Sequence, residues 1–200
     1  DVLNEIDKGA SILDVRLPND FETGFIPGSI NIGKTGMFAP WVGTIMKMNT
    51  KTILVCNKGE EKEVISRLAR IGYENIIGYF YDLEEWRKNG HELDSITSIP
   101  PSDIMLYMKD STTIIDVRKK EELQLGYVKN SLNIPLDFLD THLDQIETSE
   151  DILIYCAGGY RSMIASSILK SRGYKKIKNI YGGFNSISKN KDGLNYLKIS

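Results

Sequence analysis

Residues 151–162 of the chain read Asp151-Ile-Leu-Ile-Tyr-Cys-Ala-Gly-Gly-Tyr-Arg-Ser162. The run from Ile152 to Tyr155 is continuously apolar, as in a strand that is buried on both faces of a parallel sheet. Two consecutive glycines then allow a tight turn. In residues 162–172 the apolar positions recur at the spacing of one helical face. The stretch therefore predicts a strand, a loop and a helix, with Cys156 at the carboxyl end of the strand.

The parts that surround this stretch occur twice, in the same order. Ser11-Ile-Leu-Asp-Val-Arg16 returns as Thr113-Ile-Ile-Asp-Val-Arg118, Gly28-Ser-Ile-Asn-Ile32 returns as Asn130-Ser-Leu-Asn-Ile134, and Thr52-Ile-Leu-Val-Cys56 matches the strand before Cys156. Between the copies, the adjacent prolines in residues 92–101 favour an extended boundary segment. We therefore predict two domains, residues 1–97 and residues 98–200.

Within each half, short β-branched runs alternate with helical patterns. In the second half the expected strands are residues 114–115, 132–134, 152–155 and 177–180. Apolar strands with helices between them form a mostly parallel sheet that is covered by the helices. The predicted fold class is therefore α/β, with two tandem domains that each hold a mostly parallel sheet flanked by helices.

The composition argues against several kinds of partner. The 200 residues include 25 basic and 27 acidic side chains, a formal net charge of -2, so no large positive field exists for a nucleic acid or an anionic membrane. No apolar run is long enough to cross a bilayer and no secretion signal opens the chain, so we expect a soluble, cytoplasmic protein. The chain starts at Asp1 without a methionine, which we interpret as a fragment of something longer.

The loop that follows Cys156 has the composition of an anion-binding cradle. Its backbone N–H groups can turn inward beside the start of a helix, and such a field favours a thiolate over a thiol. Arg161 adds a planar fork of donors for an oxyanion, and Ser162 can cap the helix or donate a further hydrogen bond. Taken alone, Cys156 could be a small buried apolar residue, but its neighbours favour a nucleophile. The expected cradle residues are Ala157, Gly158, Gly159 and Tyr160.

With these motifs in order, both halves resemble the rhodanese (thiosulfate sulfurtransferase) superfamily over essentially the whole chain. The match consists of the Asp-Val-Arg strand ends, Gly126-Tyr-Val-Lys-Asn-Ser-Leu-Asn-Ile-Pro135, the Cys156 loop and Ile180-Tyr-Gly-Gly-Phe184. The resemblance implies that Cys156 takes a sulfane sulfur from a small anionic donor, thiosulfate or a low-molecular-weight persulfide, and passes it to a thiol or to cyanide. It implies no cofactor other than the persulfide on Cys156.

The resemblance also assigns roles to residues around the loop. By position, Arg161 holds the oxyanion or the carboxylate of the donor. Asp116 and Arg118 match a strand-end pair that we interpret as scaffold, and we expect Arg118 to form an ion pair with Glu122. The remaining match is a turn near the site, which we interpret as structural: Gly182 and Gly183.

Neither an imidazole nor a metal is expected at the site. The family often has histidine where this chain has Phe25 and Tyr127. The histidines of the chain, His91 and His142, lie in polar surroundings without a metal-ligand partner at useful spacing. We therefore predict surface positions for both histidines and no metal site.

The first half is expected to be catalytically inactive. Cys56 ends the equivalent strand, but the following residues, Asn57-Lys-Gly-Glu-Glu-Lys62, hold one glycine and two acids. Glu60 and Glu61 would repel an anionic donor, and Tyr81-Asp82 stands in place of the glycine turn. We expect Trp86 in the core or at an interface. A disulfide between the two cysteines requires Cα atoms within about 7 Å, which two separate sheets argue against.

Two other functions remain open from the sequence. Dual-specificity phosphatases that share this fold also use a loop cysteine and an arginine, but they place one more residue between the two than the four found here, residues 157–160. The shorter loop gives a smaller cradle, which suits one sulfur better than a tetrahedral phosphate. The second alternative is a non-catalytic binding or regulatory module, and the intact loop around Cys156 argues against it.

A wider resemblance concerns the arrangement of domains. Tandem rhodanese domains with a degenerate first member resemble the C-terminal part of bacterial fusions whose N-terminal domain is a metallo-β-lactamase-fold persulfide dioxygenase. None of the His-x-His-x-Asp-His metal ligands of that family occurs in this chain. The resemblance therefore implies a persulfide dioxygenase domain as a partner outside this chain, and no iron or zinc within it.

Overall fold

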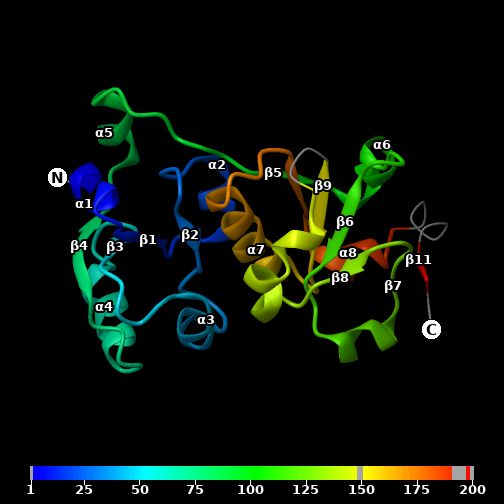
Figure 1. Cartoon of the computed structure of the whole chain (residues 1–200), viewed down its shortest axis with the longest axis horizontal. Coiled ribbons are helices and arrows are strands. Elements are labelled where there is room, and N and C mark those ends of the chain that lie inside the picture. Colours follow the sequence, from blue (N-terminus) through cyan, green and yellow to red (C-terminus); the bar gives the residue numbers. More distant parts are fainter. Residues whose placement is uncertain (1, 148–150, 191–196, 199–200) are drawn as a thin grey trace. The chain divides into compact units, whose positions relative to one another are not determined.

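The computed structural model describes residues 2–147, 151–190 and 197–198. The chain forms two compact units, Asp1–Ser95 and Ile96–Ser200, which are coloured from blue to green and from green to red in Figure 1. Thr97 lies in the second unit, because it pairs with Lys178 of the second sheet. The boundary in the structure therefore lies two residues before the predicted one, at 95/96 rather than 97/98.

The first unit is a four-stranded sheet with helices around it. Its strands lie in the order β2-β1-β3-β4, and all neighbouring pairs run parallel. The strands are β1 (Ser11–Asp14), β2 (Ile30–Asn31), β3 (Thr52–Val55) and β4 (Ile76–Phe80). The helices are α1 (Val2–Asp7), α2 (Pro18–Thr23), α3 (Phe38–Ile45), α4 (Glu61–Ala69) and α5 (Leu83–Lys88).

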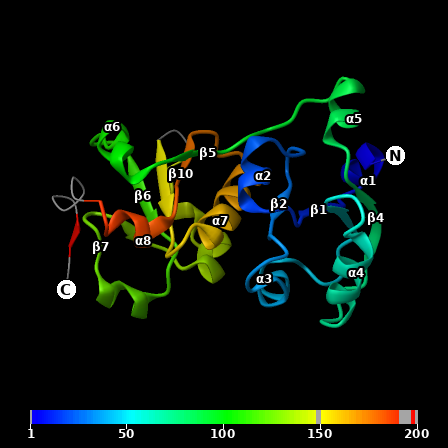
Figure 2. The ribbon, with the colours of Figure 1, turned by 180° about the vertical axis from the view of Figure 1, so that it is seen from behind.

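The second unit repeats this plan with one more strand in its parallel sheet (Figure 2). Its parallel sheet has the order β5-β10-β9-β6-β8, and a separate antiparallel pair joins β7 and β11. The strands are β5 (Thr97–Ile99), β6 (Thr113–Asp116), β7 (Tyr127–Val128), β8 (Leu132–Asn133), β9 (Ile152–Tyr155), β10 (Ile177–Ile180) and β11 (Leu197–Lys198). The α-helices are α6 (Ile104–Tyr107), α7 (Tyr160–Ser171) and α8 (Gly183–Ile187), and short 3₁₀ turns lie at Pro101–Asp103, Lys120–Leu125, Leu136–Thr141 and Leu143–Gln145.

These elements confirm the α/β fold class and the parallel sheets flanked by helices. The four strands expected in the second half are present, and β9 is buried at all four positions, as its apolar run predicts. Helix α7 differs from its prediction, because residues 162–169 are all buried rather than only one face. Small serines make this possible, since Ser167 turns its hydroxyl back to the carbonyl oxygen of Ile164 at 2.7 Å.

A buried ion pair stands where β6 ends. Both carboxylate oxygens of Asp116 accept hydrogen bonds from the Arg118 guanidinium, at 2.7 to 3.0 Å, and the two side chains are 0% and 1% exposed. Arg118 also donates to the carbonyl oxygen of Gly126 at 2.9 Å. The prediction that Arg118 pairs with the Glu122 carboxylate is wrong. Asp116 and Arg118 are two residues apart on an extended chain, so their side chains point to the same side. Asp116 is therefore the nearer partner.

The first unit contains the same arrangement at the end of β1. Arg16 donates to both oxygens of Asp14 at 2.6 to 3.0 Å and to the carbonyl oxygen of Gly24 at 2.9 Å. In both units an asparagine on the neighbouring strand donates to the carbonyl groups of the two paired residues, Asn31 at 3.1 Å and Asn133 at 2.9 Å. The repeat seen in the sequence is therefore also a repeat of buried polar contacts.

We expect Asp116→Asn to lower the free energy of unfolding of the second unit by about 3 kcal/mol, because the substitution leaves the Arg118 guanidinium buried without its counter-charge. Asp140→Asn breaks the exposed pair with Arg172 and should cost at most about 1 kcal/mol. Both tryptophans lie in the first unit, so tryptophan fluorescence does not follow the second unit. Urea unfolding is therefore measured by circular dichroism. Equal losses from the two substitutions would contradict the importance of burial.

Candidate active site

Cys156 stands where β9 ends and the loop to α7 begins. Strand β9 is the central strand of the five-stranded sheet, so the loop leaves the carboxyl edge of the sheet, where open α/β sheets bind ligands. The cysteine is 1% exposed. Its sulfur accepts a hydrogen bond from the backbone N–H of Gly159 at 3.1 Å. An amide that faces inward to the sulfur, as the sequence predicts, is therefore present.

Glycines give the loop its shape and hold it close to α8. Gly159, directly before α7, has φ +101°, and Gly183 has φ +55°. A Cβ atom on Gly183 would collide with the carbonyl oxygen of Cys156 and would lie 2.9 Å from the Ala157 carbonyl group. A Cβ on Gly182 would collide with the side chain of Ser186. The structural role expected for this glycine pair agrees with these contacts.

The other predicted cradle residues have distinct environments. The carbonyl oxygen of Ala157 accepts a hydrogen bond from the N–H of Asn185 at 2.9 Å, and the carbonyl oxygen of Cys156 accepts one from Phe184 at 2.7 Å. These two bonds fasten the loop to α8. Gly158 is exposed at the tip of the loop, and Tyr160 is half-buried as the first residue of α7.

The guanidinium group of Arg161 is already hydrogen-bonded within the protein. Its two terminal nitrogens donate to the two carboxylate oxygens of Glu122, at 2.6 and 2.7 Å, and the side chains are 18% and 30% exposed. These hydrogen bonds hold the pKa of Glu122 below its usual range, so the carboxylate remains charged. The sequence suggested Glu122 as the partner of Arg118, so this pair was not predicted. A donor that uses Arg161 must share it with Glu122.

Ser162 lies deeper than the sequence suggested. It is fully buried, and its hydroxyl donates to Oδ1 of Asn179 at 2.7 Å, with a second contact to the Gly159 carbonyl oxygen at 3.2 Å. The amide of Asn179 in turn donates to the Ser98 hydroxyl at 2.9 Å. Ser162 therefore ties α7 to β10 and does not cap the helix. Asn179 was not identified from the sequence, where it is one polar residue within an apolar strand.

The corresponding loop of the first unit carries carboxylates beside its cysteine, Cys56. Burial, followed by the charges of Glu61 and Glu60, raises the pKa of Cys56 to about 11, so this thiol stays protonated near neutral pH. Lys34 does not compensate fully, because its ammonium group already pairs with Glu60 at 2.8 Å. An anion brought to this loop would meet carboxylates.

The remaining candidates belong to other segments of the chain. His91 packs its ring against Trp86 at 4.7 Å between centroids, and Nδ1 of His142 lies 2.9 Å from the Phe138 carbonyl oxygen. Both histidines are half-buried, so their predicted surface positions are only partly right. Trp86 is 7% exposed and belongs to the core. Both cysteines are free thiols.

Neither a metal site nor a membrane span is found in the described part of the chain. Within residues 2–147, 151–190 and 197–198, no group of three or more histidine, cysteine, aspartate or glutamate side chains is arranged to hold a metal ion. In the same residues, no helix has the length and apolar character that crossing a membrane requires.

Comparisons with known proteins place these observations in a family. The model of the rhodanese-like domain matches residues 1–89 and, a second time, residues 102–190. The chain therefore belongs to the rhodanese family, with two copies of the domain.

Individual relatives cover parts of the chain. A putative sulfur carrier protein of Bacillus subtilis is 29% identical over 103 residues, covering 48% of this chain and 56% of the relative. A sulfurtransferase of Allochromatium vinosum is 28% identical over 74 residues, 37% of this chain and 69% of the relative. The crystal structure of a rhodanese-related protein from Thermoplasma volcanium is 32% identical, with a TM-score of 0.44, and covers 47% of this chain and 93% of that one. The chain thus spans about half the length of the sulfur carrier protein.

We expect Gly183→Ala to disturb the Cys156 loop. The added methyl group collides with backbone atoms of the loop, so the loop must shift, and stability should fall by about 2 kcal/mol or more. Gly173→Ala is the matched control, because Gly173 also has positive φ but has nothing within 4 Å of an added Cβ. The measurements are urea unfolding and the reaction rate of Cys156 with a thiol reagent. If the two variants change this rate equally, close packing at Gly183 does not hold the loop.

Proposed function

We propose that the second unit is a sulfurtransferase in which Cys156 carries a sulfane sulfur as a persulfide. The observation that carries the proposal is the position of its sulfur, at the carboxyl end of the central strand and 3.1 Å from the inward amide of Gly159. Membership of the rhodanese family, with relatives named as a sulfur carrier and a sulfurtransferase, supports the general kind of activity.

The proposed reaction consists of two displacements at sulfur. The Cys156 thiolate attacks the outer sulfur of thiosulfate or of a low-molecular-weight persulfide, a new S–S bond forms, and sulfite or a thiolate leaves with the electrons of the broken S–S bond. An acceptor thiolate or cyanide then attacks the outer sulfur of the Cys156 persulfide, and Cys156 leaves as a thiolate. The Gly159 N–H stabilises the sulfur anion at the start and at the end of the cycle. No cofactor is required.

The Arg161–Glu122 pair bears on which donor is used. Thiosulfate carries two negative charges, and an approach to Arg161 brings it close to the Glu122 carboxylate as well. Like charges at such distances repel, and the repulsion is stronger where water is partly excluded. A persulfide with an uncharged carbon skeleton carries at most one negative charge, so it meets a weaker repulsion. We therefore propose that low-molecular-weight persulfides are better donors than thiosulfate for this site.

The first unit is proposed to have no sulfur-transfer activity. The thiol of Cys56 is protonated near neutral pH, and its loop carries Glu60 and Glu61 instead of a pair of glycines. A thiol in this state is a poor nucleophile. The two cysteines are therefore a natural matched pair for an experiment.

Incubation with a persulfide donor or with thiosulfate should increase the intact mass of the protein by one sulfur atom. The gain should disappear in Cys156→Ala and persist in Cys56→Ala, and a reducing thiol should remove it. Measurement is by mass spectrometry, with peptide mapping of the modified residue. A sulfur gain that persists in Cys156→Ala would exclude the proposed nucleophile, and hydrolysis of a phosphate monoester without any sulfur gain would favour a phosphatase instead.

Glu122→Gln should raise kcat/KM for thiosulfate by about threefold to tenfold, because it removes one negative charge beside Arg161 and keeps the shape of the side chain. The value for an alkyl persulfide with an uncharged carbon skeleton should rise by a smaller factor, because this donor carries at most one negative charge. Glu121→Gln, an exposed change in the same turn, is the control. A parallel loss with both donors would show that Glu122 only braces the loop.

A further inference from the structure

The hydrogen bond to the Cys156 sulfur comes from a residue with little conformational restraint of its own. Gly159 donates its N–H to the sulfur at 3.1 Å and has φ +101°. Glycine has no Cβ and populates many backbone conformations, so its own side chain does not hold the peptide in this one. The direction of the Gly159 N–H must therefore be set by the groups that hold the neighbouring atoms.

Ser162 is the side chain that contacts the Gly159 peptide at the start of α7. The carbonyl oxygen of Gly159 lies 3.2 Å from the Ser162 hydroxyl and 3.2 Å from the N–H nitrogen of Met163. Both distances are at or beyond the long end of the usual range. The Ser162 hydroxyl makes a shorter bond to Oδ1 of Asn179, at 2.7 Å. One hydroxyl hydrogen can serve both acceptors in a three-centre bond, a kind that is common at helix termini.

Asn179 holds Ser162 in a fixed place because its own amide is bonded at both ends. The side chain is 3% exposed. Its oxygen accepts from Ser162, and its nitrogen donates to the hydroxyl of Ser98 on β5 at 2.9 Å. A buried amide whose donor and acceptor both have partners has one preferred orientation. Ser98, Asn179 and Ser162, here called the polar relay, thus connect β5, β10 and the first turn of α7.

The first unit provides a natural comparison, because it keeps the cysteine and the glycine but not the polar relay. By the offset of 100 that relates the two cysteines, Lys62 and Tyr79 stand where the relay has its serine and asparagine, and both are exposed. Gly59 also has positive φ, +89°. Within the described residues of the first unit, however, its N–H is not bonded to the Cys56 sulfur. Glycine at this position therefore does not by itself direct an amide at the sulfur.

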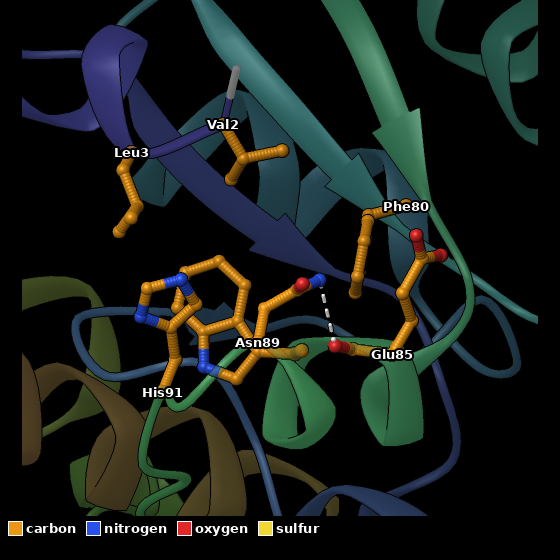
Figure 3. Close-up of a pocket in the computed structure, with 7 residues that line it drawn as sticks. Val2, Leu3, Phe80, Glu85, Asn89 and His91 are labelled. Atoms are coloured by element: carbon orange, nitrogen blue, oxygen red, sulfur yellow. Dashed lines mark hydrogen bonds between the residues drawn. The ribbon is translucent and has the colours of Figure 1, made fainter.

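The hollow of the first unit does not replace the polar relay. This hollow, of about 380 Å³, is lined by residues of α1, β4 and α5 and by two residues that follow α5, Asn89 and His91 (Figure 3). The lining residues do not include the Cys56 loop, residues 56–60. The difference between the two cysteine loops therefore lies in the residues that surround each loop.

We propose that Asn179 is a positioning residue for the sulfur transfer. It holds Ser162, and with it the first turn of α7, so that the Gly159 N–H stays directed at the Cys156 sulfur during both displacements. The effect on the reaction rate rests on the proposed function, whereas the effect on the Gly159 amide does not depend on any reaction. Because this N–H contacts the sulfur and not the donor, Asn179 acts on the rate of the chemical step and not on donor binding.

Asn179→Leu removes both hydrogen bonds of the amide and keeps a side chain of similar size. Exchange of the Gly159 amide hydrogen, followed by NMR, should become about tenfold faster or more, because the amide is no longer held in its bond. The maximal single-turnover rate of sulfur loading should fall about tenfold, less than the loss on removing a donor outright. The donor concentration that gives half of this rate should change by less than about twofold.

Two buried serines of α7 form the matched control pair. Ser162→Ala breaks the polar relay, whereas Ser167→Ala removes a hydroxyl that donates to the Ile164 carbonyl oxygen of the same helix. Both variants should lower the urea midpoint by similar amounts. Only Ser162→Ala should speed Gly159 exchange and slow sulfur loading, and Ser167→Ala should change each by less than about twofold.

Further variants test the polar relay as a unit. Ser98→Ala removes its half-buried far end and should slow loading by about twofold to threefold, so the test remains if a variant in α7 does not fold. Asn179→Leu combined with Ser162→Ala should be no slower than the slower single variant, because both act through the same contacts.

The outcomes separate the positioning role from the proposed function. Unchanged Gly159 exchange in Asn179→Leu would overturn the positioning role, and so would faster exchange with an unchanged loading rate. Equal slowing by Ser162→Ala and Ser167→Ala would also overturn it, because lost stability would then explain the effect. If the unmodified protein gains no sulfur, the proposed function fails, whereas the Gly159 exchange rates still decide whether Asn179 holds the loop.

Discussion

The buried pair of Asp116 and Arg118 connects the parts of the second unit on which the site depends. Arg118 reaches from the end of β6 to the Gly126 carbonyl oxygen, and its guanidinium lies over the ring of Phe184 at 4.1 Å. The N–H of Phe184 in turn donates to the carbonyl oxygen of Cys156. One charged group, enclosed in apolar packing, thus links two strand ends and α8 to the loop. A buried charge has few alternative partners, which makes such a link geometrically specific.

The first unit shows that this framework and the chemistry of the loop are independent. Asp14 and Arg16 make the same contacts as their counterparts, and the sheet has the same order as far as it extends. After Cys56, however, acids occupy the place of the glycines, and the thiol is held in its neutral form. The same buried ion pair therefore occurs with two different loops. Fold alone therefore says little about activity in this family.

Much of this architecture could be predicted because short stretches of the sequence determine it. The apolar run of β9, the glycines after Cys156 and the duplicated motifs are each visible within a few residues. The partners of Arg161 and Ser162 were not visible, because they lie 39 and 17 residues away in the sequence. We expected Glu122 as the partner of Arg118, but the extended backbone at the end of β6 gives that role to Asp116. The burial of the α7 serines was likewise not predicted. A serine is counted as polar in a sequence pattern, and the hydrogen bond that lets Ser167 lie in the interior is seen only in the structure.

The recessed position of Cys156 has a consequence for the timing of its reactivity. A side chain that is 1% exposed under its own loop is shielded from bulky oxidants and electrophiles in the resting state. An S–S bond is about 2.05 Å long, so loading one sulfur extends the side chain by about that length. Under the proposed chemistry, the sulfur-loaded form of the carrier brings its terminal atom closer to an acceptor, whereas the empty form admits only a donor that is small enough to reach the recessed sulfur. The burial of Cys156 then limits the reactions of the unloaded cysteine more than those of the persulfide.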